Sequence, residues 1–185
     1  MTMPGPVAAP SRWAMWLPLG LFGGFAALVL IALAHPGSHD VASQMMGKPL
    51  PQFDLPAAVM DRPGLTRAAL VGGKPRLLKV FASWCVPCAA EAPQLAALQR
   101  AGVEIDGVAI RDTPKDLAAF LARYGNPYAR IGADRVSAIQ LAIGSSGVPE
   151  TFVIDAGGTI RYQHIGDIRS DDVPLILAKL REAAK

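Results

Sequence analysis

The chain has 185 residues, 51% of them hydrophobic, and a net charge of +3 from 18 Lys and Arg against 15 Asp and Glu. Without its apolar N-terminal segment roughly 140 residues remain, which is the size of one domain that can bury most of its apolar side chains. The basic residues are scattered among acidic ones and form no basic run, which argues against nucleic-acid binding.

Residues 13–34 form an uncharged, apolar run. At about 1.5 Å per residue in a helix, the run is just long enough to cross a hydrocarbon core of about 30 Å. The competing interpretation is a cleaved signal peptide, because Ala32-Leu33-Ala34 has the small-x-small form of a cleavage site. We expect a retained transmembrane helix, since the run exceeds the usual signal-peptide core of about 7 to 15 residues and begins with two tryptophans that suit a membrane interface.

The flanks of this run predict an orientation and a division of the chain. Arg12 precedes the run, so the positive-inside rule places residues 1–12 in the cytoplasm. Residues 35–48 are then a short polar linker, and residues 49–185 form the folded domain. We expect a single-pass inner-membrane protein whose C-terminal domain lies in the periplasm, an oxidising compartment.

Within the folded domain, hydrophobic periodicity and turn residues predict strands that alternate with helices and end in a hairpin and a helix. Such an order predicts the α/β class, with a mixed central sheet flanked by helices on both faces. The expected elements are a strand at 53–55, a loop with Pro63, Gly64, Gly72 and Gly73, a strand at 76–82, a helix from 86 to about 100, a strand at 104–110, helices at 112–124 and 135–143, strands at 151–155 and 160–165 joined at Gly157-Gly158, and a helix at 171–184 with Ser170 as its N-cap.

The only two cysteines, Cys85 and Cys88, lie between the expected strand at 76–82 and the helix that follows it. Two cysteines alone cannot build a disulfide framework, so they indicate a reactive dithiol. Cys85 is expected at the helix N-terminus, where free N–H groups and the helix dipole favour a thiolate, and Cys88 follows one turn later. We therefore expect a partly exposed Cys85 to be the nucleophile and a shielded Cys88 to resolve the mixed disulfide.

A metal site is the alternative interpretation of the Cys-x-x-Cys pair. Zinc needs more cysteine or histidine ligands than the pair supplies, and the only histidines are His35, His39 and His164. The strand-to-helix context favours redox chemistry, so we expect no metal and no cofactor other than the Cys85/Cys88 disulfide itself.

Four stretches of the domain together resemble the CcmG/DsbE family of membrane-anchored, thioredoxin-like thiol:disulfide interchange proteins of cytochrome c biogenesis. The resemblance covers most of the chain from Pro49 onward, and the expected anchor agrees with it. The stretches are Phe81-Ala82-Ser83-Trp84-Cys85-Val86-Pro87-Cys88 with Glu91 and Pro93, Gly125-Asn126-Pro127-Tyr128, Gly147-Val148-Pro149-Glu150-Thr151-Phe152, and Ile160-Arg161-Tyr162 with His164 and Gly166.

The resemblance implies a thioredoxin-like fold and roles for three residues beside the cysteines. It implies that the Val148–Pro149 bond is cis and lies against the dithiol, the alternative being a trans proline that merely starts a strand. It also implies that Glu91 and Glu150 lie near the dithiol, where a carboxylate can accept the proton of Cys88; the alternative is that both are solvated. Trp84, next to Cys85, is expected to change its fluorescence with the redox state.

Lys79 departs from the family pattern, because the family usually has Asn at this position and thioredoxin a buried acid. If Lys79 points inward beneath the dithiol, its charge would stabilise a thiolate unless a neighbouring Glu neutralises it, and burial would lower its pKa. If it points outward, it is only a surface lysine. Two further departures, Ser145-Ser146 in place of an aromatic residue and the stretch 108–112, concern the surface that partners would meet.

The resemblance implies a periplasmic reductant that reduces the haem-binding Cys-x-x-Cys-His disulfide of apocytochrome c, directly or through a haem-handling partner. Electrons would come from a transmembrane donor of the DsbD/CcdA type. Two alternatives remain open: a general or copper-site-assembly thiol reductase, and a non-enzymatic metallochaperone that carries copper(I) on the same two thiols.

Overall fold

The computed structural model describes residues 16–34 and 44–185, which belong to two separate compact units, residues 1–40 and 41–185. In the first unit, α1 (Leu17–Ala34) is an apolar helix whose described side chains are mostly exposed. Within the two described ranges, no helix meets the length and apolarity required of a membrane span. The expected cytoplasmic segment 1–12, the first three residues of the expected anchor and residues 35–43 of the linker lie outside the described residues.

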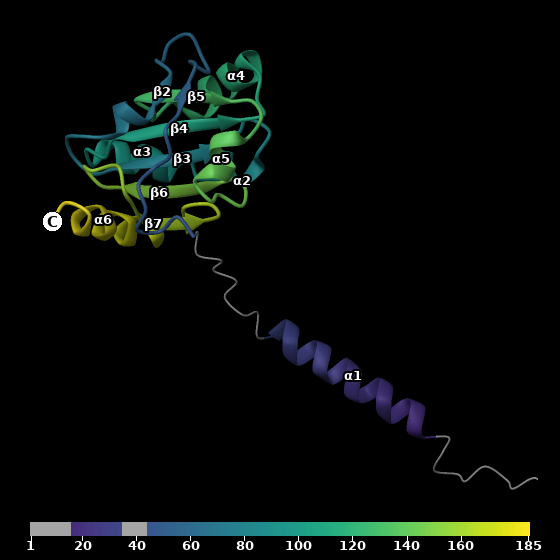
Figure 1. Ribbon diagram of the computed structural model, residues 1–185. Helices are drawn as coiled ribbons and strands as arrows, with labels where there is room; N and C mark the ends of the chain where they lie inside the picture. Colours follow the sequence, from purple (N-terminus) through teal and green to yellow (C-terminus); the bar gives the residue numbers. More distant parts are fainter. Residues whose placement is uncertain (1–15, 35–43) are drawn as a thin grey trace, which may run out of the picture. The chain divides into compact units, whose positions relative to one another are not determined.

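The second unit is built on a five-stranded sheet with the order β5-β4-β3-β6-β7. The central strand β3 (Arg76–Phe81) runs parallel to β4 (Ile105–Ile110), which runs parallel to β5 (Arg130–Asp134). On its other side β3 pairs antiparallel with β6 (Glu150–Ile154), which forms a hairpin with β7 (Ile160–Ile165). The expected mixed sheet is confirmed (Figure 1).

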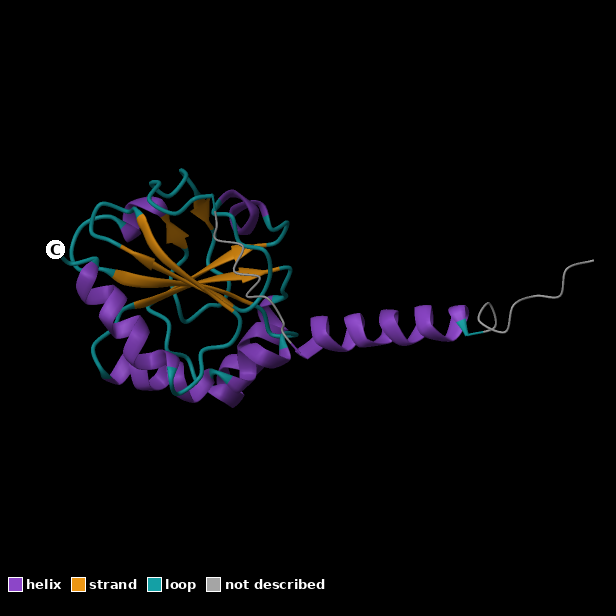
Figure 2. Ribbon diagram, turned by 90° about the horizontal axis from the view of Figure 1, so that it is seen from below, coloured by secondary structure: helices purple, strands orange, loops and turns teal. Residues whose placement is uncertain are grey.

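Helices cover both faces of this twisted sheet, as Figure 2 shows. The hairpin turn at Gly157-Gly158 is confirmed, with Gly158 at a φ of 78° that glycine adopts without steric penalty. All six residues of β3 are buried, and its four apolar side chains belong to the hydrophobic core. The helices are α2 (Val86–Ala90), α3 (Ala92–Arg100), α4 (Pro114–Tyr124), α5 (Ala138–Ala142) and α6 (Asp172–Glu182).

Two details of the expected helices are wrong. The helix expected from 86 to 100 is divided at Glu91, because Pro93 in the first turn of α3 has no N–H to continue the hydrogen-bond ladder of α2. The N-cap of α6 is Asp171 and not Ser170, and its side chain makes no capping bond. Instead, the Asp172 carboxylate accepts the Arg169 N–H at 2.8 Å.

Three elements were missed in the sequence. Residues 56–75, expected as a loop, contain β2 (Leu65–Thr66), which pairs with β1 (Asp54–Leu55), and the 3-10 helix η1 (Arg67–Leu70). The third missed element is β5, which contains a glycine and no alternating pattern. That glycine, Gly132, faces the β1–β2 hairpin so closely that an added Cβ would lie 2.7 Å from the Leu55 Cβ and 2.9 Å from the Leu65 Cβ.

The start of the domain is hydrogen-bonded to the region around the start of β7, an edge strand of the sheet. The Gly47 N–H donates to the Ile160 carbonyl at 2.8 Å, and the Ile160 N–H donates to the Lys48 carbonyl at 3.0 Å. The Leu50 N–H completes the set by donating to the Gly158 carbonyl at 2.8 Å. The chain therefore enters the domain as a short extension beside the β6–β7 hairpin.

The close approach at Gly132 predicts that Gly132→Ala lowers the free energy of unfolding by about 1 to 3 kcal/mol, because the new methyl group overpacks against backbone-proximal atoms of the hairpin. Gly147→Ala is the matched control, since an added Cβ there meets no atom within 4 Å. Urea unfolding of both variants checks the prediction. Equal losses in the two variants would contradict it.

Candidate functional site

The two cysteines lie where β3 passes into α2. Cys85 is the N-cap of α2, and its Sγ accepts the Cys88 N–H at 3.2 Å. The two residues form a disulfide, with their Cα atoms 5.3 Å apart. The expected difference in exposure is absent in this state, because Cys85 and Cys88 are 4% and 3% exposed.

Pro149 lies beside this junction. The Val148–Pro149 bond is cis, as expected, so the alternative of a trans proline is wrong. Val80 pairs with Glu150 in the sheet register, so Pro149 lies level with the end of β3, from which the redox loop departs. The Pro149 carbonyl accepts the Gly166 N–H at 2.9 Å, which ties the proline to the end of β7.

Lys79 points inward and is fully buried, which excludes a surface lysine. Its Nζ lies 2.6 Å from Glu91 Oε1 and 2.8 Å from Glu91 Oε2, and it donates to Thr151 Oγ1 at 3.0 Å. Glu91 Oε2 also accepts the Ile168 N–H at 2.9 Å. Glu91 therefore neutralises the charge of Lys79, so Lys79 does not act as a free positive charge on the dithiol.

Burial moves the pKa values of this pair toward each other. Desolvation lowers the pKa of Lys79, although Glu91 opposes the change. Desolvation raises the pKa of Glu91, although Lys79 opposes it. The low-dielectric interior thus favours the neutral form of each group, whereas the attraction between the two groups favours their charged forms.

Glu150 is also buried, so the alternative that Glu91 and Glu150 are solvated is wrong. Its carboxylate accepts the Ser146 N–H at 2.9 Å, the Ser146 hydroxyl, and the Gln163 side-chain N–H at 3.1 Å. Ser146, which departs from the family pattern, therefore has a structural partner. Glu150 begins β6 directly after the cis proline, and these bonds fix its carboxylate there.

Two residues that were not predicted as site residues, Arg111 and Asp112, bond the segment before Cys85. Trp84 is 56% exposed, and its indole N–H donates to the Arg111 carbonyl at 3.3 Å. Ser83 donates its backbone N–H and its hydroxyl to the Asp112 carboxylate, at 2.6 and 2.7 Å. Asp112 lies 29 residues from Ser83, so only the fold brings them together.

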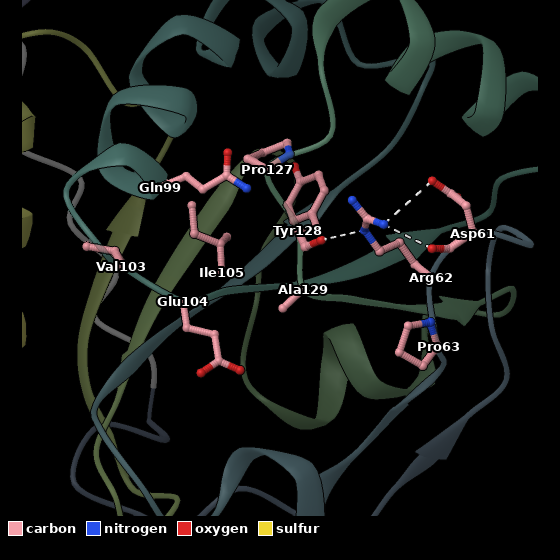
Figure 3. Close-up of a pocket in the computed structure, with 10 residues that line it drawn as sticks. All are labelled: Asp61, Arg62, Pro63, Gln99, Val103, Glu104, Ile105, Pro127, Tyr128 and Ala129. Carbon is pink, nitrogen blue, oxygen red and sulfur yellow. Dashed lines mark hydrogen bonds and ion pairs between the residues drawn. The ribbon is translucent and has the colours of Figure 1, made fainter.

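A cleft of about 420 Å³ lies at the opposite end of the parallel strands from the cysteines (Figure 3). It opens where β4 begins, whereas the cysteines follow the end of β3, and the two strands are parallel. Arg62 crosses the cleft and donates to the Tyr128 carbonyl at 2.8 Å. The Tyr128 ring stacks on Phe81 at 4.5 Å. The family-like Gly125–Tyr128 stretch therefore supports the core beneath β3.

The described residues contain no cluster of side chains that could bind a metal ion. Neither 16–34 nor 44–185 contains a group of three or more His, Cys, Asp and Glu side chains placed to hold an ion. His164 lies with Nε2 3.2 Å from the Asp167 carbonyl and 3.7 Å from an Asp172 carboxylate oxygen.

The Lys79–Glu91 pair predicts that Glu91→Gln lowers the free energy of unfolding at pH 7 by about 3 to 5 kcal/mol, because it leaves a buried ammonium without its carboxylate. Lys79→Met combined with Glu91→Leu removes both charges and is expected to recover most of the loss. Breaking the exposed Lys179–Glu182 pair with Glu182→Gln is the matched control and should leave stability essentially unchanged.

The loss in Glu91→Gln should also depend on pH. The pKa of Lys79 in the folded state is lowered from 10.5, so its contribution to stability is present above that unfolded value and is lost as the pH falls through the folded pKa. In Glu91→Gln the carboxylate that opposes this lowering is absent, so Lys79 loses its proton at a lower pH than in the wild type. The difference in stability between wild type and Glu91→Gln therefore narrows as the pH rises from about 7 toward 10. Urea unfolding across this range measures it, and a difference that widened would contradict the burial of a charged Lys79.

Comparison with known proteins agrees with this geometry. The Redoxin family profile matches residues 45–180. The thiol:disulfide interchange protein HelX of Rhodobacter capsulatus is 38% identical over 157 residues, covering 85% of this chain and 89% of HelX. DsbE of Escherichia coli K12 is 38% identical over 163 residues, covering 85% of this chain and 87% of DsbE.

A solved structure gives the same result. A Chlorobium tepidum protein provisionally assigned as a thiol:disulfide interchange protein DsbE superposes with a TM-score of 0.59 at 26% identity, over 76% of this chain and 98% of that one. The Cys85–Cys88 disulfide at the strand-to-helix junction is consistent with the names of these relatives, which are thiol:disulfide interchange proteins. The chain therefore belongs to the redoxin family and, within it, to the thiol:disulfide interchange proteins of the DsbE/HelX type.

Proposed function

We propose that this thiol:disulfide oxidoreductase works as a reductant in cytochrome c maturation, with the haem-binding Cys-x-x-Cys-His disulfide of apocytochrome c as its substrate. The observation that carries the proposal is the Cys85–Cys88 disulfide at the α2 N-terminus, level with cis Pro149. The helix N-terminus favours a thiolate at Cys85, and similarity to the thiol:disulfide interchange proteins DsbE and HelX supports exchange chemistry at this disulfide.

The reaction is two thiol–disulfide exchanges. The Cys85 thiolate attacks one sulfur of the substrate disulfide, forms a mixed disulfide and releases the first substrate thiolate. Cys88 then loses its proton and attacks Cys85 Sγ, which re-forms the Cys85–Cys88 bond and releases the second substrate thiolate. Two electrons pass to the substrate, and two protons complete its thiols.

Glu91 is the proposed acceptor for the proton of Cys88. It follows Cys88 by three residues at the end of α2, is buried, and holds a carboxylate whose pKa is raised by that burial. Lys79 keeps this carboxylate in place, and Glu150 is the second acid beside the cis proline. The backbone before Pro149 is the proposed strand on which an extended substrate segment pairs.

The electron source and the location are part of the same proposal. An oxidising compartment holds no soluble reductant for the disulfide, so a transmembrane donor of the DsbD/CcdA type would return it to the dithiol. Residues 13–34 are the proposed anchor, residues 1–12 the cytoplasmic end, residues 35–48 the linker and residues 49–185 the periplasmic domain. The uncharged, apolar sequence of residues 13–34 supports this division.

The reduction potential of the Cys85/Cys88 pair tests the direction of electron flow. Equilibration with glutathione and dithiothreitol buffers is expected to give a value near or below about −270 mV, that of thioredoxin, because a reductant must be reducing enough to donate. A value near about −120 mV, that of DsbA, would identify an oxidant and rule out the proposed role. Stoichiometric copper(I) binding without disulfide turnover would instead favour the metallochaperone.

Trapping tests the substrate and the order of attack. Cys88→Ser is expected to accumulate a mixed disulfide between Cys85 and an oxidised Cys-x-x-Cys-His peptide, because no resolving thiol remains. Cys85→Ser should form none, and it serves as the matched control. Mass spectrometry of the adducts, before and after reduction, identifies the linked residue. Adducts through Cys88 in the Cys85→Ser protein would contradict the assigned order.

A further inference from the structure

The loop between β4 and α4 is hydrogen-bonded to the redox loop, residues 82–85, which joins β3 to α2. The two Asp112 carboxylate oxygens accept separate bonds from Ser83, one from its backbone N–H at 2.6 Å and one from its hydroxyl at 2.7 Å. Ser83 precedes the nucleophile by two residues. The position of the chain just before Cys85 is therefore set by a side chain of the neighbouring strand's loop and not only by the continuation of β3.

Arg111, the residue before Asp112, provides a second contact with the redox loop. Its carbonyl accepts the Trp84 indole N–H at 3.3 Å, while its Nε donates to Ser137 Oγ at 3.0 Å and its N–H donates to the Asp134 carbonyl at 3.2 Å. Each of these contacts links Arg111 to a different segment. Together they connect the redox loop to the ends of β4 and β5.

The backbone at this hub is unusual. Arg111 has a φ of 47° and Ser137 a φ of 59°, in the left-handed region that side chains other than glycine rarely adopt, and the two residues are bonded to each other. Such conformations persist only where the surrounding contacts over-determine them, and they gather at functional sites. Below them, Asp134 caps α5 by accepting the N–H groups of three successive residues at 2.8 to 2.9 Å.

We propose that Arg111 and Asp112 are positioning residues for the dithiol, which hold Ser83 and Trp84 so that Cys85 Sγ stays at the N-terminus of α2. The proposal rests on the proposed attack by Cys85. None of the four bonds that join Arg111 and Asp112 to Ser83, Trp84 and Ser137 uses a sulfur atom, so reduction of the disulfide does not itself remove a donor or an acceptor from them.

Loss of the Asp112 charge and loss of the position of Cys85 would shift the pH at which Cys85 becomes reactive in opposite directions. The two effects can therefore be distinguished. A negative charge near a thiolate disfavours it, so loss of the Asp112 charge alone would lower the pH at which Cys85 becomes reactive. Loss of alignment with the helix N-terminus would raise that pH. The other charged groups on the surrounding elements are all unchanged in an Asp112 variant. They are Arg76 and Lys79 of β3, Glu91 at the end of α2, Asp106 of β4, Lys115, Asp116 and Arg123 of α4, Arg130 and Asp134 of β5, Glu150 of β6 and Arg111 itself.

The test measures alkylation of Cys85 against pH in the full chain with Cys88→Ser, so that one thiol reacts. Adding Asp112→Ala is expected to raise the pH midpoint by about one unit and to slow alkylation about tenfold at pH values below the midpoint, since the thiolate fraction falls with it. Asp112→Asn, which keeps one acceptor oxygen and removes the charge, should restore most of the loss. Asp116→Asn, an exposed carboxylate in the first turn of α4, is the charge-matched control and should leave the midpoint unchanged.

Two smaller variants keep the test decisive if Asp112→Ala does not fold. Ser83→Ala removes one of the two bonds to Asp112 and keeps the backbone bond, and Trp84→Phe removes only the indole donor. Each is expected to move the midpoint upward by less than Asp112→Ala does. A midpoint that falls would show a charge effect alone, and one that stays constant would show a merely structural role; either result overturns the proposal. Because alkylation needs no protein substrate, the outcome is independent of the cytochrome c assignment.

Discussion

The ion pair between Lys79 and Glu91 is the interaction around which this domain is assembled. Its three partners come from separate elements: Lys79 from the central strand, Glu91 from the junction of α2 and α3, and Thr151 from the neighbouring strand β6. The Ile168 N–H adds the segment before α6 to the same carboxylate. Taking two charges out of water is unfavourable unless geometry and hydrogen bonds compensate, so burial of the pair requires these elements to lie where its bonds can form.

The helix break at Glu91 follows from the same arrangement. Glu91 ends α2 and begins α3, so its side chain is presented at a corner of the helix pair, where it reaches the lysine beneath. Cys88 is on the short first helix, one turn before this corner. The ion pair therefore joins the end of the cysteine-bearing helix to the central strand, while the loop of Arg111 and Asp112 bonds Ser83 and Trp84 on the other side of Cys85.

Local patterns sufficed for the elements that carry the chemistry. The apolar run of β3, the Cys-x-x-Cys pair and Pro87 indicated the strand-to-helix junction, and the resemblance supplied the cis bond at Pro149. The strand β5 was not predictable by the same means, because Gly132 lowers its strand propensity. The physical reason for that glycine is a contact with the β1–β2 hairpin, which is distant in the sequence. Propensity and packing conflict there, and packing decides.

The same limit applies to the site. Strand alternation placed Lys79 on one face of β3 but could not show that Glu91 faces it, because the helix break that turns Glu91 inward depends on Pro93 and the packing of α3. Asp112 could not be found at all, since no local pattern indicates that a residue after β4 bonds the residue before Trp84. Contacts between the ends of neighbouring parallel strands become visible only once the strand order is known.

The bonds that join residues 47–50 to the start of β7 have a mechanical consequence. A pull or a twist applied through the chain before Gly47 is received first by the Ile160 and Gly158 backbone groups, at an edge strand of the sheet. Two strand pairings, β7 to β6 and β6 to β3, separate that edge from the strand that leads to the cysteines. Within the sheet, a load applied there therefore reaches the strand that leads to the cysteines only through these two pairings.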